Sequence, residues 1–165
     1  MKKYLVASAL ACTVLSSSAF SADGVINFTG KIVDNACVVN PTLNVQMGDV
    51  AAAKFKNVGD ESGTQDFLLE LKDCPANLSS AKVTLDGAAD ANNAELFKLN
   101  DAGAAGLALR IAGPDKKDVI PGGSSAEVKL AEGDNVLPFT AAYKSTDKVT
   151  AGDANATIQF SVSYN

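Results

Sequence analysis

The sequence predicts an all-β protein folded as an antiparallel β-sandwich. Apolar and polar residues alternate along several short segments, as they do in strands with one buried face. Stretches rich in Gly, Asp, Asn and Pro separate these segments and predict turns. No internal repeat, linker or low-complexity tract is present, so we expect one folded domain.

The first 21 residues have the layout of a secretory signal peptide. Two lysines precede an almost unbroken apolar run, residues 4–14, and small residues follow it. The run is too short for a transmembrane helix. Cleavage sites fit after Ser21 and after Ala19, and we favour Ser21. The mature chain would then start at Ala22 and would not insert into a membrane.

The mature chain is expected to be acidic and of single-domain size. Removing residues 1–21 leaves 144 residues, with 12 basic side chains against 19 acidic ones. Only one of the basic residues is an arginine, Arg110. A net charge of −7 offers no electrostatic footprint for nucleic acid, and we expect no nucleic-acid partner.

Six segments show the period of two that predicts strands. They are Thr64–Lys72, Ala81–Leu85, Leu107–Ala112, Ala126–Leu130, Val136–Tyr143 and Ala156–Tyr164. In the last segment one face carries Ile158, Phe160, Val162 and Tyr164. Two other stretches, Gly48–Phe55 and Asp86–Leu99, hint at a helical turn.

Two cysteines remain after the signal peptide, Cys37 and Cys74. An even pair in an exported chain predicts a disulfide. Closing a loop of this length stabilises a fold by about 4 kcal/mol in the chain-entropy description. A metal or redox site is the weaker interpretation, because the chain has no histidine and no CxxC motif.

The residues that enzymes commonly need are missing. Without histidine there is no Ser-His-Asp triad and no HExxH zinc site, and GxSxG and the P-loop are also absent. A pair of carboxylates could still serve a glycosidase. However, the carboxylates lie mainly in loops, where turn formation and solubility account for them. We therefore predict no enzymatic activity, no cofactor and no metal site.

A strong strand pattern also occupies residues 22–34, ahead of the first cysteine. Ile26, Phe28, Gly30 and Ile32 share one face. The simpler interpretation is a first strand within the chain's own sandwich. Gly30 is unusual there, since glycine weakens a strand unless another group approaches closely. Burying the three large side chains would contribute about 5–9 kcal/mol gross, comparable to the net stability of a domain.

Five motifs, in order along the whole chain, resemble the chaperone–usher pilins of the type 1 fimbrial major subunit family. They are GKIVDNACVV (30–39), VQMGDV (45–50), LELKDCP (69–75), NVLPFTAAY (135–143) and an alternating ending with penultimate Tyr164. The resemblance implies an immunoglobulin-like sandwich that lacks its last strand, formed by residues 35–165. Residues 22–34 would be an N-terminal donor strand that completes another subunit.

The resemblance also implies partners and residue roles. The donor strand would insert Ile26, Phe28, Gly30 and Ile32, and the acceptor groove would be edged by Ile158, Phe160, Val162 and Tyr164. The Cys37–Cys74 bridge would hold the first strand beside the next. Partners would be copies of itself or sister pilins, a periplasmic chaperone and an outer-membrane usher. The product would pass through the periplasm to a fimbria on the cell surface.

Other functions stay open at this point. A minor adaptor pilin has the same architecture and is poorly separated from a shaft subunit by sequence. A self-complemented secreted binding domain would use its own N-terminal strand to complete its fold. A tip adhesin is not expected, because it needs a second, ligand-binding domain and 144 residues do not allow one.

Overall fold

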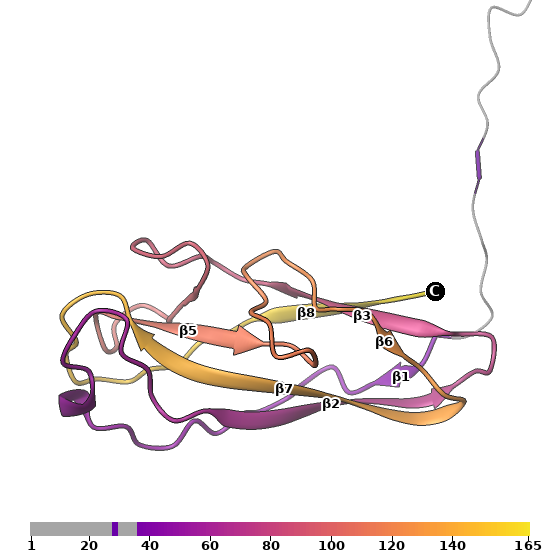
Figure 1. The fold of residues 1–165 in the computed structure, drawn as a ribbon, viewed down its shortest axis with the longest axis horizontal. Helices are drawn as coiled ribbons and strands as arrows, with labels where there is room; N and C mark the ends of the chain where they lie inside the picture. Colours follow the sequence, from indigo (N-terminus) through magenta and orange to yellow (C-terminus); the bar gives the residue numbers. More distant parts are fainter. Residues whose placement is uncertain (1–27, 30–35) are drawn as a thin grey trace, which may run out of the picture. The chain divides into compact units, whose positions relative to one another are not determined.

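The structure is a computed structural model that describes residues 28–29 and 36–165. All the described strands belong to one compact unit, Val33–Asn165 (Figure 1). The predicted signal peptide lies outside the described residues, and so do the predicted donor residues Ile26, Gly30 and Ile32. In the part of the chain that is described, no helix is long and apolar enough to cross a membrane.

The strands form two antiparallel sheets, which confirms the predicted fold class. The larger sheet runs in the order β1 (Val38–Val39), β2 (Gln65–Cys74), β7 (Gly133–Ser145), β5 (Leu107–Ala112) and β4 (Phe97–Lys98). The smaller sheet runs β6 (Val128–Lys129), β3 (Ser80–Asp86) and β8 (Gln159–Tyr164). Figure 1 shows β3 and β8 in one layer and β2 and β7 in the other.

The core lies between the two sheets. Its largest fully buried side chains include Leu71 on β2, Leu137 and Phe139 on β7, and Val83 on β3. Alternate residues of each strand supply these side chains, as the period of two predicts. The rings of Phe67 and Phe139, which are opposite each other in the β2–β7 ladder, stack with centroids 5.5 Å apart. Each large apolar side chain contributes about 1.5–3 kcal/mol when fully buried.

Strand β7 is longer than the sequence predicts and contains a proline. Pro138 has no N–H to donate, so it is expected only where one side of the strand lacks a partner. Strand β5 pairs with β7 only as far as the Ala112–Thr140 pair. At Pro138 the strand therefore pairs with β2 alone, opposite Leu68. The proline fits because this part of β7 is an edge.

The two stretches that hint at a helical turn have different outcomes. A short 3₁₀ helix, η1 (Ala52–Lys54), confirms the first. The second, Asp86–Leu99, contains turns and β4 but no helix. Its side chains bond the backbone instead: Asp90 accepts from the N–H groups of Asn92 and Asn93 at 3.0 and 3.1 Å. Such local bonds favour turns over helix.

Two loops meet backbone to backbone at one end of the unit, residues 100–106 and 146–155. The N–H of Ala104 donates to the carbonyl of Asp153 at 2.8 Å, and that of Thr150 donates to Ala105 at 3.1 Å. A Cβ at Gly103 would overlap the carbonyl oxygen of Asp153. Glycine is therefore required there by the close approach of the two chains.

We expect Gly103→Ala to destabilise the protein by about 1–3 kcal/mol, since the overlap with the carbonyl of Asp153 forces the backbone to shift. Gly63→Ala is the matched control, because a Cβ at Gly63 meets no atom within 4 Å and the backbone there is not left-handed. Urea unfolding of the two variants measures the difference. Equal midpoints for both variants would show that the loop contact tolerates a side chain.

Candidate functional site

Strand β8 forms one edge of the smaller sheet. It pairs with β3 from Ala81–Tyr164 to Asp86–Gln159, and no described strand pairs with its other side. An unpaired edge exposes a row of N–H and C=O groups that can accept another strand. The backbone of β8 is therefore available to an additional chain.

The inward side chains of β8 are incompletely covered. Phe160, Val162 and Tyr164 of β8, and Ile158 just before it, are only half-buried, although they pack against the core. On the neighbouring β3, the inward residues Ala81, Val83 and Leu85 are buried. A further strand along the open side of β8 would cover these side chains as well. The four residues predicted to edge an acceptor groove thus share a partly open apolar surface.

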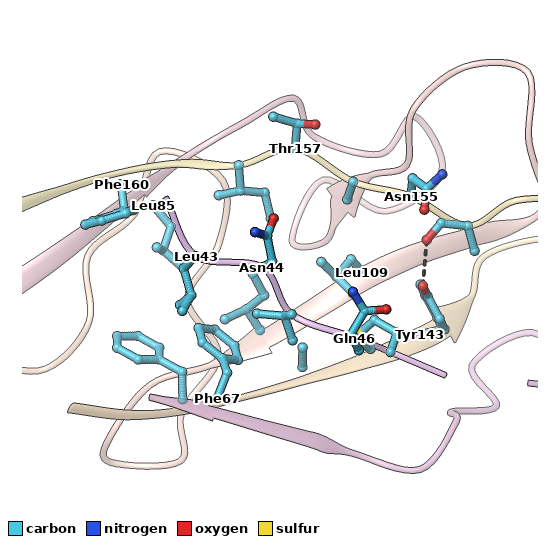
Figure 2. A pocket seen from close by; sticks show the side chains of 18 of the residues that line it. Leu43, Asn44, Gln46, Phe67, Leu85, Leu109, Tyr143, Asn155, Thr157 and Phe160 are labelled. Atoms are coloured by element: carbon cyan, nitrogen blue, oxygen red, sulfur yellow. Dashed lines mark hydrogen bonds between the residues drawn. The ribbon is translucent and has the colours of Figure 1, made fainter. Parts of the chain in front are cut away.

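This surface belongs to an apolar groove of about 1370 Å³. Residues 36–50 run along it on one side and residues 149–164 on the other. Its floor comes from the inward faces of the larger sheet, including Leu69, Leu109 and Phe139. Figure 2 shows side chains from all three regions, among them Leu43, Phe67 and Phe160. The volume exceeds the 300–1,000 Å³ typical of small-molecule sites and suits an extended peptide.

The segment that follows β1 alternates like a strand without pairing as one. Val45 and Met47 are half-buried in the groove, while Asn44 and Gln46 are exposed. Between Asn40 and Val50 no residue belongs to a strand. An extended chain that lacks a neighbour on one side shows this pattern. Sequence reasoning identified this segment only through the VQMGDV resemblance, since its alternation is short.

Tyr143 fixes the end of the groove where the chain approaches β8. Its hydroxyl donates to the carbonyl of Ala154 at 2.6 Å, and its backbone N–H donates to the hydroxyl of Ser62 at 2.9 Å. Burial raises the pKa of Tyr143 further above its ordinary value, which already lies well above neutral pH, so the hydroxyl is protonated and able to donate there. The segment leading into β8 is thereby tied to β7.

A disulfide joins Cys37 to Cys74, with Cα atoms 4.3 Å apart, as the sequence predicts. It lies beside the pairs Val38–Lys72 and Val39–Leu71, which are the whole ladder between β1 and β2. A two-residue strand has little pairing of its own. The bridge therefore holds in place the strand that leads into residues 40–50 of the groove.

A polar cluster ties down the other end of β8. The carboxylate of Glu127 accepts hydrogen bonds from the hydroxyl of Ser80 and, at 2.8 Å, from the side-chain amide of Asn165. The carbonyl of Asn165 also accepts from the N–H of Ser79 at 2.7 Å. The bonds from Ser80 and then Asn165, with the charge of Lys82, hold the pKa of Glu127 below its ordinary value.

This cluster predicts an acid-dependent loss of stability. The pKa of Glu127 is lower in the folded state than in the unfolded state, where it is about 4.3. Its contribution to the free energy of unfolding is therefore present above the unfolded-state pKa and is lost as the pH falls through the folded-state pKa. Melting temperatures of the wild type and Glu127→Gln between pH 3 and 7 measure it. On acidification, the melting temperature of the wild type should fall further than that of the variant. Parallel curves would show that Glu127 contributes nothing.

The described part of the chain holds no cluster of three or more His, Cys, Asp or Glu side chains placed to bind a metal ion. The side chains on the groove floor are mainly apolar. The groove can therefore bind a strand through its edge and its apolar floor.

Comparison with known proteins decides the family. Residues 26–165 match the family described as fimbrial protein. The chain belongs to the fimbrial protein family. Long polar fimbria protein A of Salmonella typhimurium is 40% identical, over 99% of this chain and 97% of the relative. The probable major fimbrial subunit LpfA of Escherichia coli O157:H7 is 38% identical, over 99% and 97%.

Solved structures agree with this assignment. An antigen and type I fimbria protein of Burkholderia pseudomallei is 34% identical, with a TM-score of 0.63 over 80% of this chain and 91% of that one. The P pilus rod subunit PapA has a TM-score of 0.69 over 79% of this chain and 100% of that one. At 24% identity the second likeness supports the fold alone.

Family membership confirms the predicted class of function. The fimbrial subunit is a structural component of pili rather than an enzyme, and it associates with copies of itself or with sister subunits in extracellular fimbriae. The structure brings Cys37 and Cys74 together and places Ile158, Phe160, Val162 and Tyr164 along the groove. Phe28 is the one predicted donor residue that is described, and the donor role stays a prediction.

Proposed function

We propose that this fimbrial subunit is a major shaft subunit that polymerises by donor-strand exchange. Residues 22–34 of one copy would occupy the groove of the next. The observation that carries the proposal is the free edge of β8 beside an open apolar groove. The 38% identical relative described as a probable major fimbrial subunit supports the shaft role.

The chemistry of residues 22–34 suits this groove. An extended segment beside β8 would pair with the exposed N–H and C=O groups of the edge, in the manner of β-strand addition. Ile26, Phe28 and Ile32 would cover the half-buried side chains of β8. Gly30 would lie where the groove is too shallow for a larger side chain to enter.

The same open groove accounts for the proposed route of assembly. A subunit that exposes an apolar groove and a strand edge is prone to aggregate before it polymerises. A periplasmic chaperone that lends a strand would cover both features. An outer-membrane usher would then exchange that strand for the donor segment of the next subunit. Residues 1–21 would serve as the export signal and be removed on the way.

Polymer formation in the periplasm tests the proposal directly. The full-length subunit should give SDS-resistant ladders in unboiled samples, and a chain without residues 22–33 should give none. Phe28→Asp should also reduce the ladder sharply, because a buried unpaired carboxylate is costly. Asn27→Asp is its control, since residue 27 is on the opposite face of the segment.

The alternative of a self-complemented secreted domain has a different outcome. It predicts a monomer from the full-length chain and no SDS-resistant ladder. Equally stable monomers from the full-length and shortened chains would refute donor-strand exchange.

A further inference from the structure

An apolar patch lies on the outer face of the larger sheet, away from the groove. Leu68 on β2 is opposite Pro138 on β7, and Val136 is diagonal to Leu68 on the same face. Leu68 and Val136 are 51% and 52% exposed, and Pro138 is also exposed. These three residues form what we call the outer patch. Val38, 59% exposed, lies beyond it on β1.

On the β5 side of this face, charged side chains and the loops that carry them cover the sheet. Arg110 on β5 contacts Asp118 at 2.7 Å and Glu61 at 3.5 Å, and Lys144 on β7 contacts Glu61 at 3.0 Å. Ala142, opposite Arg110 in the ladder, is only 1% exposed. The loops that carry Glu61 and Asp118 therefore protect that half of the sheet. These loops leave the other half uncovered, and there the outer patch lies beside the exposed ion pair of Glu70 and Lys72, whose charged atoms are 3.3 Å apart.

The path of the chain points to a second copy of the subunit as the occupant. Four residue steps separate Val38 from Asp34, the end of the proposed donor segment, a reach of at most about 14 Å. Lys72, opposite Val38, is four residues from Leu68 along β2, or about 13 Å. A domain of this size has a radius of gyration of about 14 Å. The copy that receives the donor segment is thus tethered within reach of the outer patch.

The small size of the patch fits a contact made only within the polymer. Stable interfaces bury roughly 800 Å² per partner, and three half-exposed side chains offer only a fraction of that. Free subunits would not dimerise through it. A short tether, however, raises the effective concentration of the neighbour to roughly the millimolar range. A weak contact is then populated along the fibre without causing association beforehand.

We propose that the outer patch of Leu68, Val136 and Pro138 is a lateral contact with the neighbouring subunit that holds this subunit's donor strand. The inference rests on the proposed donor-strand exchange. It adds a second contact between the two subunits, which restricts their motion relative to each other and stiffens the fibre.

Photo-crosslinking in assembled fimbriae tests this contact. A benzoylphenylalanine replaces Leu68 in the full-length chain, and the control places it at Ile120, which is 46% exposed and outside the patch. After irradiation, boiled samples should contain several-fold more crosslinked dimer from position 68 than from position 120. Mass spectrometry should identify the captured chain as the same subunit.

The charged variant Leu68→Lys with Val136→Lys gives an independent measurement. Its SDS-resistant ladder should match that of the wild type, while the persistence length of its fibres in electron micrographs should fall several-fold. Ile120→Lys should change neither property.

The outcomes separate the two proposals. A normal ladder with equal crosslinking at positions 68 and 120, or with unchanged stiffness, would overturn the lateral contact and leave donor-strand exchange intact. Capture of a different protein at position 68 would overturn it as well. Loss of the ladder from the unmodified chain would refute both proposals.

Discussion

A fimbrial subunit that carries a second copy of residues 22–34 after Asn165, joined by a short turn, should be a stable monomer. The turn returns the added segment antiparallel to β8, where it can enter the groove of its own chain. Its Ile26, Phe28 and Ile32 equivalents contribute about 5–9 kcal/mol before the cost of ordering the strand is subtracted. The unfolding midpoint in urea should therefore rise, and so should the m-value, since more surface is buried.

Two further chains make this result specific to the groove. In the first, the added copy carries Asp in place of its Phe28 equivalent, and most of the gain should vanish. In the second, the added segment has the same composition in scrambled order, which destroys the alternation. A similar gain from all three chains would mean that the tail stabilises the protein without filling the groove.

The strands were predictable where one face is buried and the other is exposed. Leu107–Ala112 has the bounds that its sequence predicts. Strand β8 begins at Gln159, three residues later than predicted, because its partner β3 ends at Asp86, opposite Gln159. Just upstream the chain bonds to another loop, where the N–H of Asn100 donates to the carbonyl of Asn155 at 2.7 Å. Alternation alone does not reveal that a backbone is used by another loop.

The predicted strand Ala126–Leu130 shortens for a similar reason. Strand β6 has only Val128 and Lys129, which pair with Ala81 and Ser80. Ser125 lies just before the predicted strand, and its hydroxyl accepts a hydrogen bond from the N–H of Val83 at 3.1 Å. A side chain takes the place of a ladder bond at that point, and a period of two carries no sign of it.

The groove itself is a property of topology. Each of its walls looks like an ordinary half-buried strand in the sequence. That β8 has a partner on one side only depends on the strand order β6-β3-β8, which local patterning does not specify. The resemblance to pilins supplied this feature, whereas the residues alone left a self-contained sandwich open. The outer patch escaped prediction because Leu68 and Val136 read as ordinary strand residues.

Replacing Cys37 and Cys74 together by Ser should lower the free energy of unfolding by about 4 kcal/mol, because the bridge closes a loop over a sequence separation of 37. The urea midpoint of the wild type should be higher than that of the double variant without reductant. With reductant it should fall to the value of the double variant. Reductant should leave the double variant unchanged. Equal midpoints for the oxidised wild type and the variant would contradict the prediction.

Loss of the bridge should also make the polymer dissociate more easily. This effect is separate from the loss of stability of the single subunit. The ladder between β1 and β2 has only two residue pairs, so residues 40–50 depend on the bridge for their position along the groove. Once that wall moves, a donor strand can pair with β8 but packs poorly on its other side. At a temperature where the double variant is still folded, its SDS-resistant ladder should therefore dissociate at a lower temperature than the wild-type ladder. Equal dissociation temperatures would mean that β1 holds its place without the disulfide.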